Sequence, residues 1–177
     1  LIIKAQGKGT MVTPPLQYAV GDAIVNPLIS LCKEQITATH ISYNYASPTG
    51  IARSKLNLTE NDIVLACNCV YSSKDINLGY SFIQIPSQYF KVLDLNTSDT
   101  NSIKDIITGS IFNNASQSDI VIKLIYANDI EVGFLGISAG TPLLLMESLL
   151  LDEHLKPFAR CKFYLIPEYY HLAFSIK

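Results

Sequence analysis

One short string in this chain matches a catalytic motif of hydrolases. Residues 136–140 read Gly-Ile-Ser-Ala-Gly, the G-x-S-x-G spacing that places a nucleophilic serine on a sharp turn between a strand and a helix. Here a short helical pattern precedes the string and a β-rich run follows it, so the order of the elements is reversed. We therefore interpret the two glycines as a connection from a helix to a strand, and we expect no catalytic residue there.

Two cysteines, Cys67 and Cys69, flank Asn68 in an apolar run. Alternation along a strand puts both thiols on one face, but a catalytic thiol needs a base held beside it. No histidine is near in sequence, although one could approach in the folded chain. Zinc sites usually combine two close pairs of ligands, and the four cysteines do not have that spacing. The sequence predicts reduced thiols packed in a core, with no metal site and no cofactor.

Composition bounds the class of protein. The chain has 177 residues, of which 49% are hydrophobic and 16% charged, and its net charge is −2. This length and apolar content predict one well-cored domain, whereas a free-standing DNA-binding domain is usually basic. No apolar run approaches the roughly 18 residues that cross a bilayer. We expect a cytoplasmic protein without a membrane partner, and a first residue Leu1 in place of Met suggests a fragment of a longer chain.

The elements that must position any site follow from periodicity and from turn residues. Two short extended runs at 1–5 and 10–13, joined through Gly7 and Gly9, predict a hairpin. Helices are expected from Pro27, from Ser47-Pro48-Thr49 through Leu56, over 102–108 and over 130–135. Strands are expected at 37–45, 63–71, 77–85, 119–126, 142–151, 158–165 and 170–176. Paired strands with single helices between them favour an α+β fold with an antiparallel sheet.

Three stretches together resemble a known family. Residues 7–12, Gly-Lys-Gly-Thr-Met-Val, resemble the tail of the wing in a GntR-type winged helix-turn-helix domain. Two further stretches resemble two elements of the UTRA sensor domain of the HutC/FarR subfamily, namely Ile51-Ala52, Leu56, Leu58 and 62–64 with the hairpin ending at Ile85-Pro86, and 135–137 and 140–144 with Asp152 and Pro157. The resemblance implies a chorismate-lyase-like antiparallel sheet with flanking helices. It also implies a wing tail at 1–13, a linker at 14–22, a sensor domain at 23–177, and a winged-helix domain that precedes Leu1.

The resemblance also suggests where a small molecule would bind. Relatives that bind phosphosugars carry two arginines where this chain has Cys69 and Tyr71, and a glutamate where it has Ser81. Further positions implied by the resemblance are Ser102 and Lys104 on a helix, with Arg160, Lys162 and Tyr164 on a late strand. We expect a pocket over the sheet face lined by Tyr71, Ser81 and Tyr164, with Ser102 and Lys104 approaching from the helix; the alternative is that both tyrosines only pack the core. Without the two arginines, the effector is either a phosphosugar held differently or a less anionic metabolite.

The function implied by the resemblance is therefore allosteric control of an operator-binding homodimer by a small metabolite. Apolar strands at the end of the chain, whose edges need covering, support the dimer. DNA would be bound through the missing domain and not by this segment. Two alternatives are a small-molecule enzyme on the same fold, which would turn over its ligand, and a purely structural dimerisation module, which would have no ligand pocket.

Overall fold

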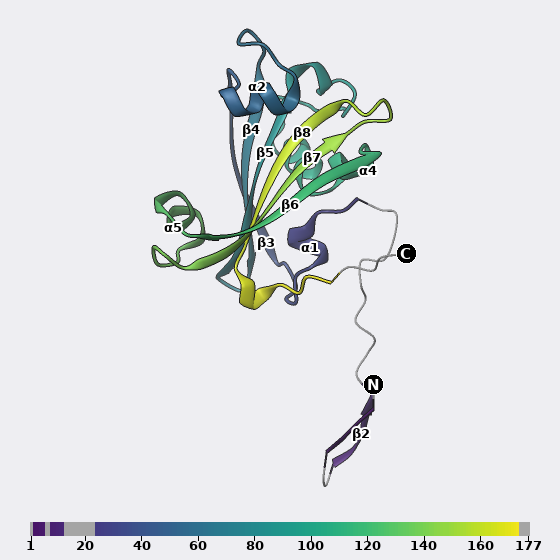
Figure 1. Cartoon of the computed structure of the whole chain (residues 1–177), viewed down its shortest axis with the longest axis vertical. Helices are drawn as coiled ribbons and strands as arrows, with labels where there is room; N and C mark the ends of the chain where they lie inside the picture. Colours follow the sequence, from purple (N-terminus) through teal and green to yellow (C-terminus); the bar gives the residue numbers. More distant parts are fainter. Residues whose placement is uncertain (1, 6–7, 13–23, 174–177) are drawn as a thin grey trace.

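The computed structural model describes residues 2–5, 8–12 and 24–173, and its main body is one antiparallel sheet with helices on both faces (Figure 1). Six strands pair in the order β3-β4-β5-β8-β7-β6. Their bounds are β3 Ala38–Ala46, β4 Val64–Ser73, β5 Ile76–Pro86, β6 Gln117–Tyr126, β7 Pro142–Leu151 and β8 Pro157–Leu165. The last two described strands thus lie inside the sheet, and within the described part of the chain the free edges belong to β3 and β6.

Short helices connect the strands, and most begin at a residue that caps them. The helices are α1 Pro27–Ser30, α2 Gly50–Leu56, α3 Thr100–Asp105, α4 Ile111–Asn113 and α5 Asp129–Leu135, and a π-helical turn at Ile106–Ser110 joins α3 to α4. Two 3-10 turns, Ser87–Tyr89 and Pro167–Tyr169, follow β5 and β8. Asn26 and Thr49 cap α1 and α2 by accepting backbone hydrogen bonds.

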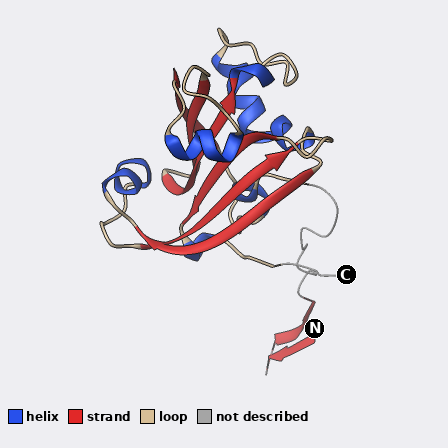
Figure 2. Cartoon of the chain, turned by 45° about the horizontal axis from the view of Figure 1, so that its top comes forward, coloured by secondary structure: helices blue, strands red, loops and turns tan. Residues whose placement is uncertain are grey.

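The two faces of the sheet pack against different helices, and Figure 2 shows the helices distributed along the twisted strands. Residues directly opposite each other in an antiparallel pair share a face. One face, called here the α1 face, packs against α1 and the α3–α4 region and holds the larger apolar core. The other, called the α5 face, packs a smaller cluster around Tyr80, Tyr164 and Leu135.

One expected strand is wrong. The run from Tyr170 to Ile176 was expected to join the sheet, but over the described residues it makes only an isolated bridge between Tyr170 and Cys32. Pro167 turns the chain away after β8, whose two edges are already paired with β5 and β7. The departing segment instead binds the chain next to α1, because Lys33 N donates to Tyr169 O and His171 N donates to Leu31 O.

The remaining expectations mostly agree with the structure. The expected hairpin at the start of the chain is present as β1 Ile2–Ala5 paired with β2 Lys8–Val12, whereas the expected linker at 14–22 lies outside the described residues. The helix expected to end at Thr108 continues through the π-helical turn to Asn113. Among the described residues, no helix is long and apolar enough to cross a membrane, and no three metal-binding side chains gather.

Candidate ligand-binding site

Polar side chains are buried on the α1 face, where α1 packs against β5 and β8. Asn26 is 5% exposed, and its Nδ2 donates to Tyr71 Oη at 2.9 Å and to Thr108 O at 3.1 Å. Its Oδ1 accepts from Leu28 N at 3.0 Å, which is the cap of α1. One side chain therefore holds the helix end, the sheet and the π-helical turn together, and Tyr71 is completely buried beneath it.

A second polar group on this face lacks a partner. Ser81 lies directly opposite Cys69 in the β4–β5 pair and is fully buried. Its Oγ makes no hydrogen bond of good geometry to any described residue, although the Tyr71 hydroxyl lies near enough to interact with it. Because buried hydroxyls are nearly always hydrogen-bonded in folded proteins, Ser81 is a buried polar group whose hydrogen-bonding capacity the described residues leave partly unused.

Helix α3 contributes a positively charged side chain, Lys104, to the same face of the sheet. Lys104 of α3 is half-buried, and its charge is near enough to influence the Cys69 thiol. Burial raises the pKa of the Cys69 thiol to about 11, although the neighbouring Tyr71 hydroxyl and the Lys104 ammonium act in the opposite direction. Burial likewise raises the pKa of Cys67 to about 12. Both thiols are protonated at neutral pH, so neither is a ready nucleophile, and their predicted packing in the core is confirmed.

The space above these groups is filled in this structure. A β-carbon on Gly79 would lie 2.7 Å from Leu28 Cδ2 and 2.9 Å from Tyr170 Oη. Tyr170 Oη in turn donates to Leu28 O at 3.4 Å. Only glycine leaves room for Leu28 and Tyr170 to pack this closely on β5, on the face that carries Tyr71 and Ser81. Because Tyr71 and Ser81 are fully buried, a ligand would reach them only after a packed element had moved.

Four of the eight expected site residues are thus brought together, namely Cys69, Tyr71, Ser81 and Lys104. Ser102 lies in the same helix as Lys104, but its Oγ accepts a hydrogen bond from Asn96 N at 3.1 Å and so stabilises the preceding loop.

The other three expected residues lie on the opposite face. Tyr164 is directly opposite Tyr80, whereas Ser81 is opposite Phe163, so the expectation that Tyr164 lines one face with Tyr71 and Ser81 is wrong. Tyr164 stacks on Tyr80 with ring centroids 4.3 Å apart.

Arg160 and Lys162 share the α5 face with Tyr164. Arg160 Nη1 donates to Gln84 Oε1 at 2.9 Å, and Lys162 is directly opposite Glu147. Burial, followed by the charge of Arg160, lowers the pKa of Lys162.

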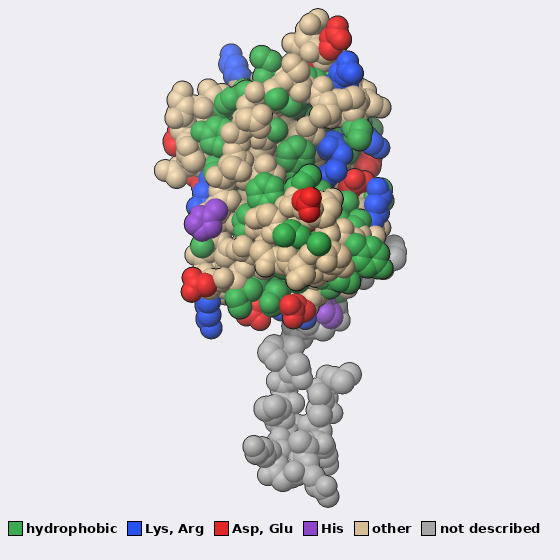
Figure 3. All heavy atoms as spheres, turned by 90° about the vertical axis from the view of Figure 1, so that its left-hand side faces the viewer, with side chains coloured by type: hydrophobic (Ala, Val, Ile, Leu, Met, Phe, Trp, Pro, Cys, Tyr) green, Lys and Arg blue, Asp and Glu red, His purple; other side chains and the backbone are tan. Residues whose placement is uncertain are grey.

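On the side of the molecule drawn in Figure 3, basic side chains are interspersed with acidic ones and form no continuous basic surface.

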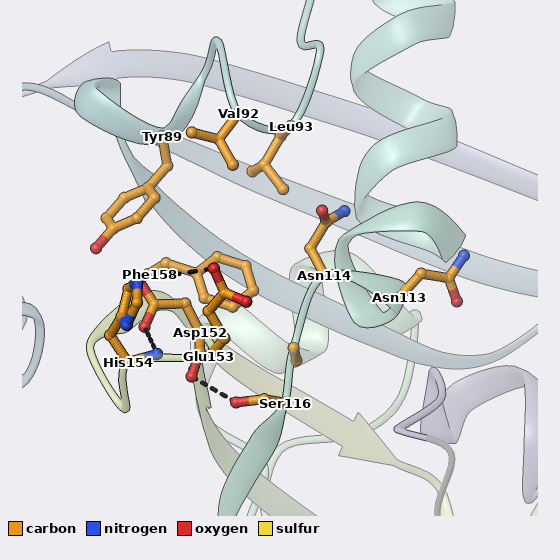
Figure 4. A pocket seen from close by; sticks show the side chains of 11 residues that line it. Tyr89, Val92, Leu93, Asn113, Asn114, Ser116, Asp152, Glu153, His154 and Phe158 are labelled. Carbon is orange, nitrogen blue, oxygen red and sulfur yellow. Dashed lines mark hydrogen bonds and ion pairs between the residues drawn. The ribbon is translucent and has the colours of Figure 1, made fainter.

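An open cleft that the sequence did not suggest lies between three loops (Figure 4). Its volume is about 530 Å³, and its walls come from the turn after β5, the α4–β6 connection and the β7–β8 turn. The Asp152 carboxylate accepts from His154 N and Lys156 N, both at 2.9 Å. These backbone bonds lower the pKa of Asp152 and commit its carboxylate to the turn. No sequence signal pointed to the cleft, because its walls come from segments far apart in the chain.

The hydrolase-like string has the context expected for a connection. Gly136 ends α5 with φ 67°, Gly140 has φ 79°, and β7 follows two residues later. Ser138 is exposed, and its carbonyl accepts the Thr141 hydroxyl at 2.7 Å. The helix precedes the serine and the strand follows it, which is the reverse of a nucleophile elbow.

Comparison with known proteins identifies the domain type. The family model for the UTRA domain matches residues 33–171. Among solved structures, the chain is similar to the ligand-binding domain of a protein assigned to the GntR family of regulators in Bordetella bronchiseptica, with 17% identity, a TM-score of 0.66, and coverage of 79% of this chain and 92% of that one.

Two further structures show the same fold. A GntR-family transcriptional regulator from Enterococcus faecalis is 20% identical, with a TM-score of 0.64 and coverage of 78% and 100% of the two chains. The C-terminal domain of the histidine utilization repressor from Pseudomonas syringae is 15% identical, with a TM-score of 0.65 and coverage of 78% and 97%. A search of curated protein sequences gives no match.

Proposed function

Because the chain belongs to the UTRA domain family, we propose that it is the effector-sensing part of a GntR-type transcription regulator of the HutC/FarR subfamily. In this proposal a small metabolite binds the domain and controls operator binding by a DNA-binding domain elsewhere in the protein. The domain forms a homodimer, acts as a sensor for a repressor, and carries out no chemistry on its ligand.

The buried polar set on the α1 face is the observation that supports this proposal most directly. Tyr71, Asn26 and Ser81 are buried polar groups beside an otherwise apolar core, and among the described residues Ser81 Oγ has no hydrogen-bond partner of good geometry. Burying polar groups is costly unless they are hydrogen-bonded. A ligand with hydroxyl groups would satisfy Ser81, and Lys104 would supply one positive charge for an acidic group. The effector we propose is a sugar phosphate or a related hydroxylated acid.

Binding at this site would act through α1. Leu28 and Tyr170 pack closely over Gly79 on the face that carries Tyr71 and Ser81, so in this proposal a ligand selects conformations in which α1 has left the sheet. Residues before α1 lead back to the β1–β2 hairpin, whose sequence resembles the end of a wing. Displacement of α1 would therefore alter how the sensor is joined to the DNA-binding domain. Allosteric control requires that the ligand favour one of two such arrangements, and the position of α1 would distinguish them.

An enzyme on the same fold is the second candidate. Against it, the thiols on the α1 face have raised pKa values, and the serine of the G-x-S-x-G string lies in a reversed context. Turnover of a bound metabolite would favour the enzyme, whereas binding without turnover would favour the sensor.

The test begins with a thermal-shift screen of sugar phosphates, amino acids and related metabolites. A ligand at 100 times its dissociation constant adds about 2.7 kcal/mol of stability. Its affinity is then measured for Tyr71→Phe and Lys104→Ala, with Lys162→Ala on the opposite face and His154→Ala in the open cleft as controls. Loss of a hydrogen bond to a charged group costs about 1.5–3 kcal/mol, so the first two variants should bind at least tenfold more weakly.

The outcomes separate the alternatives. If His154→Ala alone among the four variants binds the ligand more weakly, the effector lies in the open cleft and the proposed site is wrong. Stability unchanged by every metabolite would favour a purely structural module. The chain alone should give no operator-specific gel shift, while a protein that also carries the winged-helix domain should give one.

A further inference from the structure

The free edge at β6 is the most apolar exposed element of the described chain. Ile120, Val121, Leu124 and Tyr126 are 50%, 52%, 60% and 65% exposed, and Ile122 is 39% exposed. Among the residues that the structure describes, strand β6 pairs with β7 on one side only, so its other side presents backbone groups along ten residues that no described strand pairs with. A long, apolar free edge of this kind associates with another strand unless the protein protects it.

The opposite edge of the sheet is built differently. The outward residues His40, Ser42 and Asn44 of β3 are polar and exposed. The hydroxyls of Tyr43 and Tyr45 bind Thr100 Oγ1 and Thr97 O, so the α3 region partly covers this edge. This difference between the two edges favours β6, and not β3, as the edge that associates with another copy. The terminal strands, whose edges were expected to drive dimerisation, lie inside the sheet, so the β6 edge is the physical reason for a dimer.

We propose that β6 pairs antiparallel with β6 of a second copy of this chain, with Val121 opposite its own counterpart, to form one continuous twelve-stranded sheet. This inference rests on the proposed homodimer and specifies its interface. A two-fold axis perpendicular to the sheet maps each face onto itself, so any symmetric pairing must join residues on the same face.

Charge complementarity selects the register. With Val121 at the axis, Asp119 of each copy lies opposite Lys123 of the other, and Ile120 lies opposite Ile122. With Ile122 at the axis, Lys123 would face Val121 and Asp119 would face Ile125, so both charges would be buried against apolar side chains. Like charges would meet if Lys123 were at the axis. Opposite charges across a strand pair are favourable and like charges are not.

The charges in this register also extend an existing contact. Lys123 Nζ already donates to Glu147 Oε2 at 2.8 Å within one copy, and in the dimer it would lie between Glu147 and the second copy's Asp119. Because a specific interface buries at least about 1,000 Å² in total, the pairing has to cover most of the exposed β6 side chains on both copies.

Disulfide trapping tests the register directly. Cys67, Cys69 and Cys161 are buried, so a Cys32→Ser background removes the accessible thiol. In this background, Val121→Cys places two thiols on strands whose opposed α-carbons are about 4.5–5.5 Å apart, within the range of a disulfide. Leu124→Cys is the matched exposed control, because its α-carbon lies six residues, or about 20 Å, from that of its counterpart. We expect a cross-linked dimer from Val121→Cys and none from Leu124→Cys or the background.

Sedimentation tests the interface without a cross-link. At tens of micromolar, the unmodified chain should be a dimer. Val121→Lys should raise the dimer dissociation constant at least tenfold, since it sets two ammonium groups against each other at the axis. Ser42→Lys on the β3 edge is the matched control and should leave association unchanged. Circular dichroism confirms that both variants fold, which is expected because both side chains are exposed.

The possible failures are distinct. If Val121→Lys folds and still dimerises as the unmodified chain does, β6 is not the interface, although the homodimer stands. If the unmodified chain is a monomer at these concentrations, both the homodimer and the pairing are wrong, while effector binding is judged separately by the metabolite screen. Cross-linking by Leu124→Cys and not by Val121→Cys would overturn the register.

Discussion

Replacing Gly79 with alanine is the sharpest test of how α1 closes the sheet. The added β-carbon would lie 2.7 Å from Leu28 Cδ2, 2.7 Å from Tyr164 O and 2.9 Å from Tyr170 Oη. The two side-chain atoms can move, but Tyr164 O belongs to a backbone held between β5 and β7. Overpacking of this kind costs about 1–3 kcal/mol, and a backbone neighbour puts the expected loss near the upper end.

The matched control is Gly133→Ala in α5. Its β-carbon would meet nothing within 4 Å, and its position is helical, so alanine should add up to about 1 kcal/mol. At about 2–4 °C per kcal/mol for a chain of this size, thermal unfolding should shift downward by about 6–12 °C for Gly79→Ala and upward by about 2–4 °C for Gly133→Ala.

A second readout follows the position of α1. Displacing Leu28 and Tyr170 also loosens the bridge between Tyr170 and Cys32, so the Cys32 thiol of Gly79→Ala should react faster with a thiol reagent. A Gly79→Ala protein that melts within about 2 °C of the unmodified chain, with unchanged Cys32 reactivity, would refute the close approach of α1 to β5.

Three further predictions follow from the described contacts. Asn26→Ala should lower the free energy of unfolding, measured by urea denaturation, by about 2–3 kcal/mol, because it removes both the cap of α1 and a buried hydrogen bond. A decrease of less than about 1 kcal/mol would mean that only the cap contributes to stability. At pH 8, a thiol reagent should modify at most Cys32 in the folded chain and all four cysteines after denaturation, since burial raises the pKa of the other three. The hydrogen bond from Lys123 lowers the pKa of Glu147 in the folded state, so its stabilising contribution is present above the unfolded pKa and is lost as pH falls through the folded pKa. The unmodified chain should therefore lose more stability on acidification than Glu147→Gln, and parallel pH profiles for the two would contradict this.

Sequence patterns predicted which residues of one strand share a face but not how faces match between strands. Alternation along a strand places Cys69 with Tyr71, and Lys162 with Tyr164, and the structure agrees. The relation between the two groups depends on register, and a shift of one residue reverses every side chain. Tyr164 pairs with Tyr80 and not with Ser81, a relation that no local pattern encodes.

Tertiary packing also overruled two local expectations. The apolar run from Tyr170 resembles a strand, yet the sheet had no free edge beside β8, and the aromatic ring of Tyr170 packs under α1 instead. Gly109 and Ser110 look like a helix end, but Ile106, Ile107 and Ile111 are buried on the sheet and keep the chain helical through a π turn. The open cleft depends wholly on long-range assembly, so no motif could have indicated it.

The hydrogen bonds that join Lys33 to Tyr169 and Leu31 to His171 link nearly opposite ends of the described domain. A contact between residues so distant in sequence requires the closure of a very long loop, whose entropy cost is met only after intervening contacts have formed. We therefore expect α1 and the segment after β8 to join late in folding, once the six strands are paired. The step that completes folding is then the step that covers Tyr71 and Ser81, and its reversal is a local unfolding event that exposes them while the sheet stays intact.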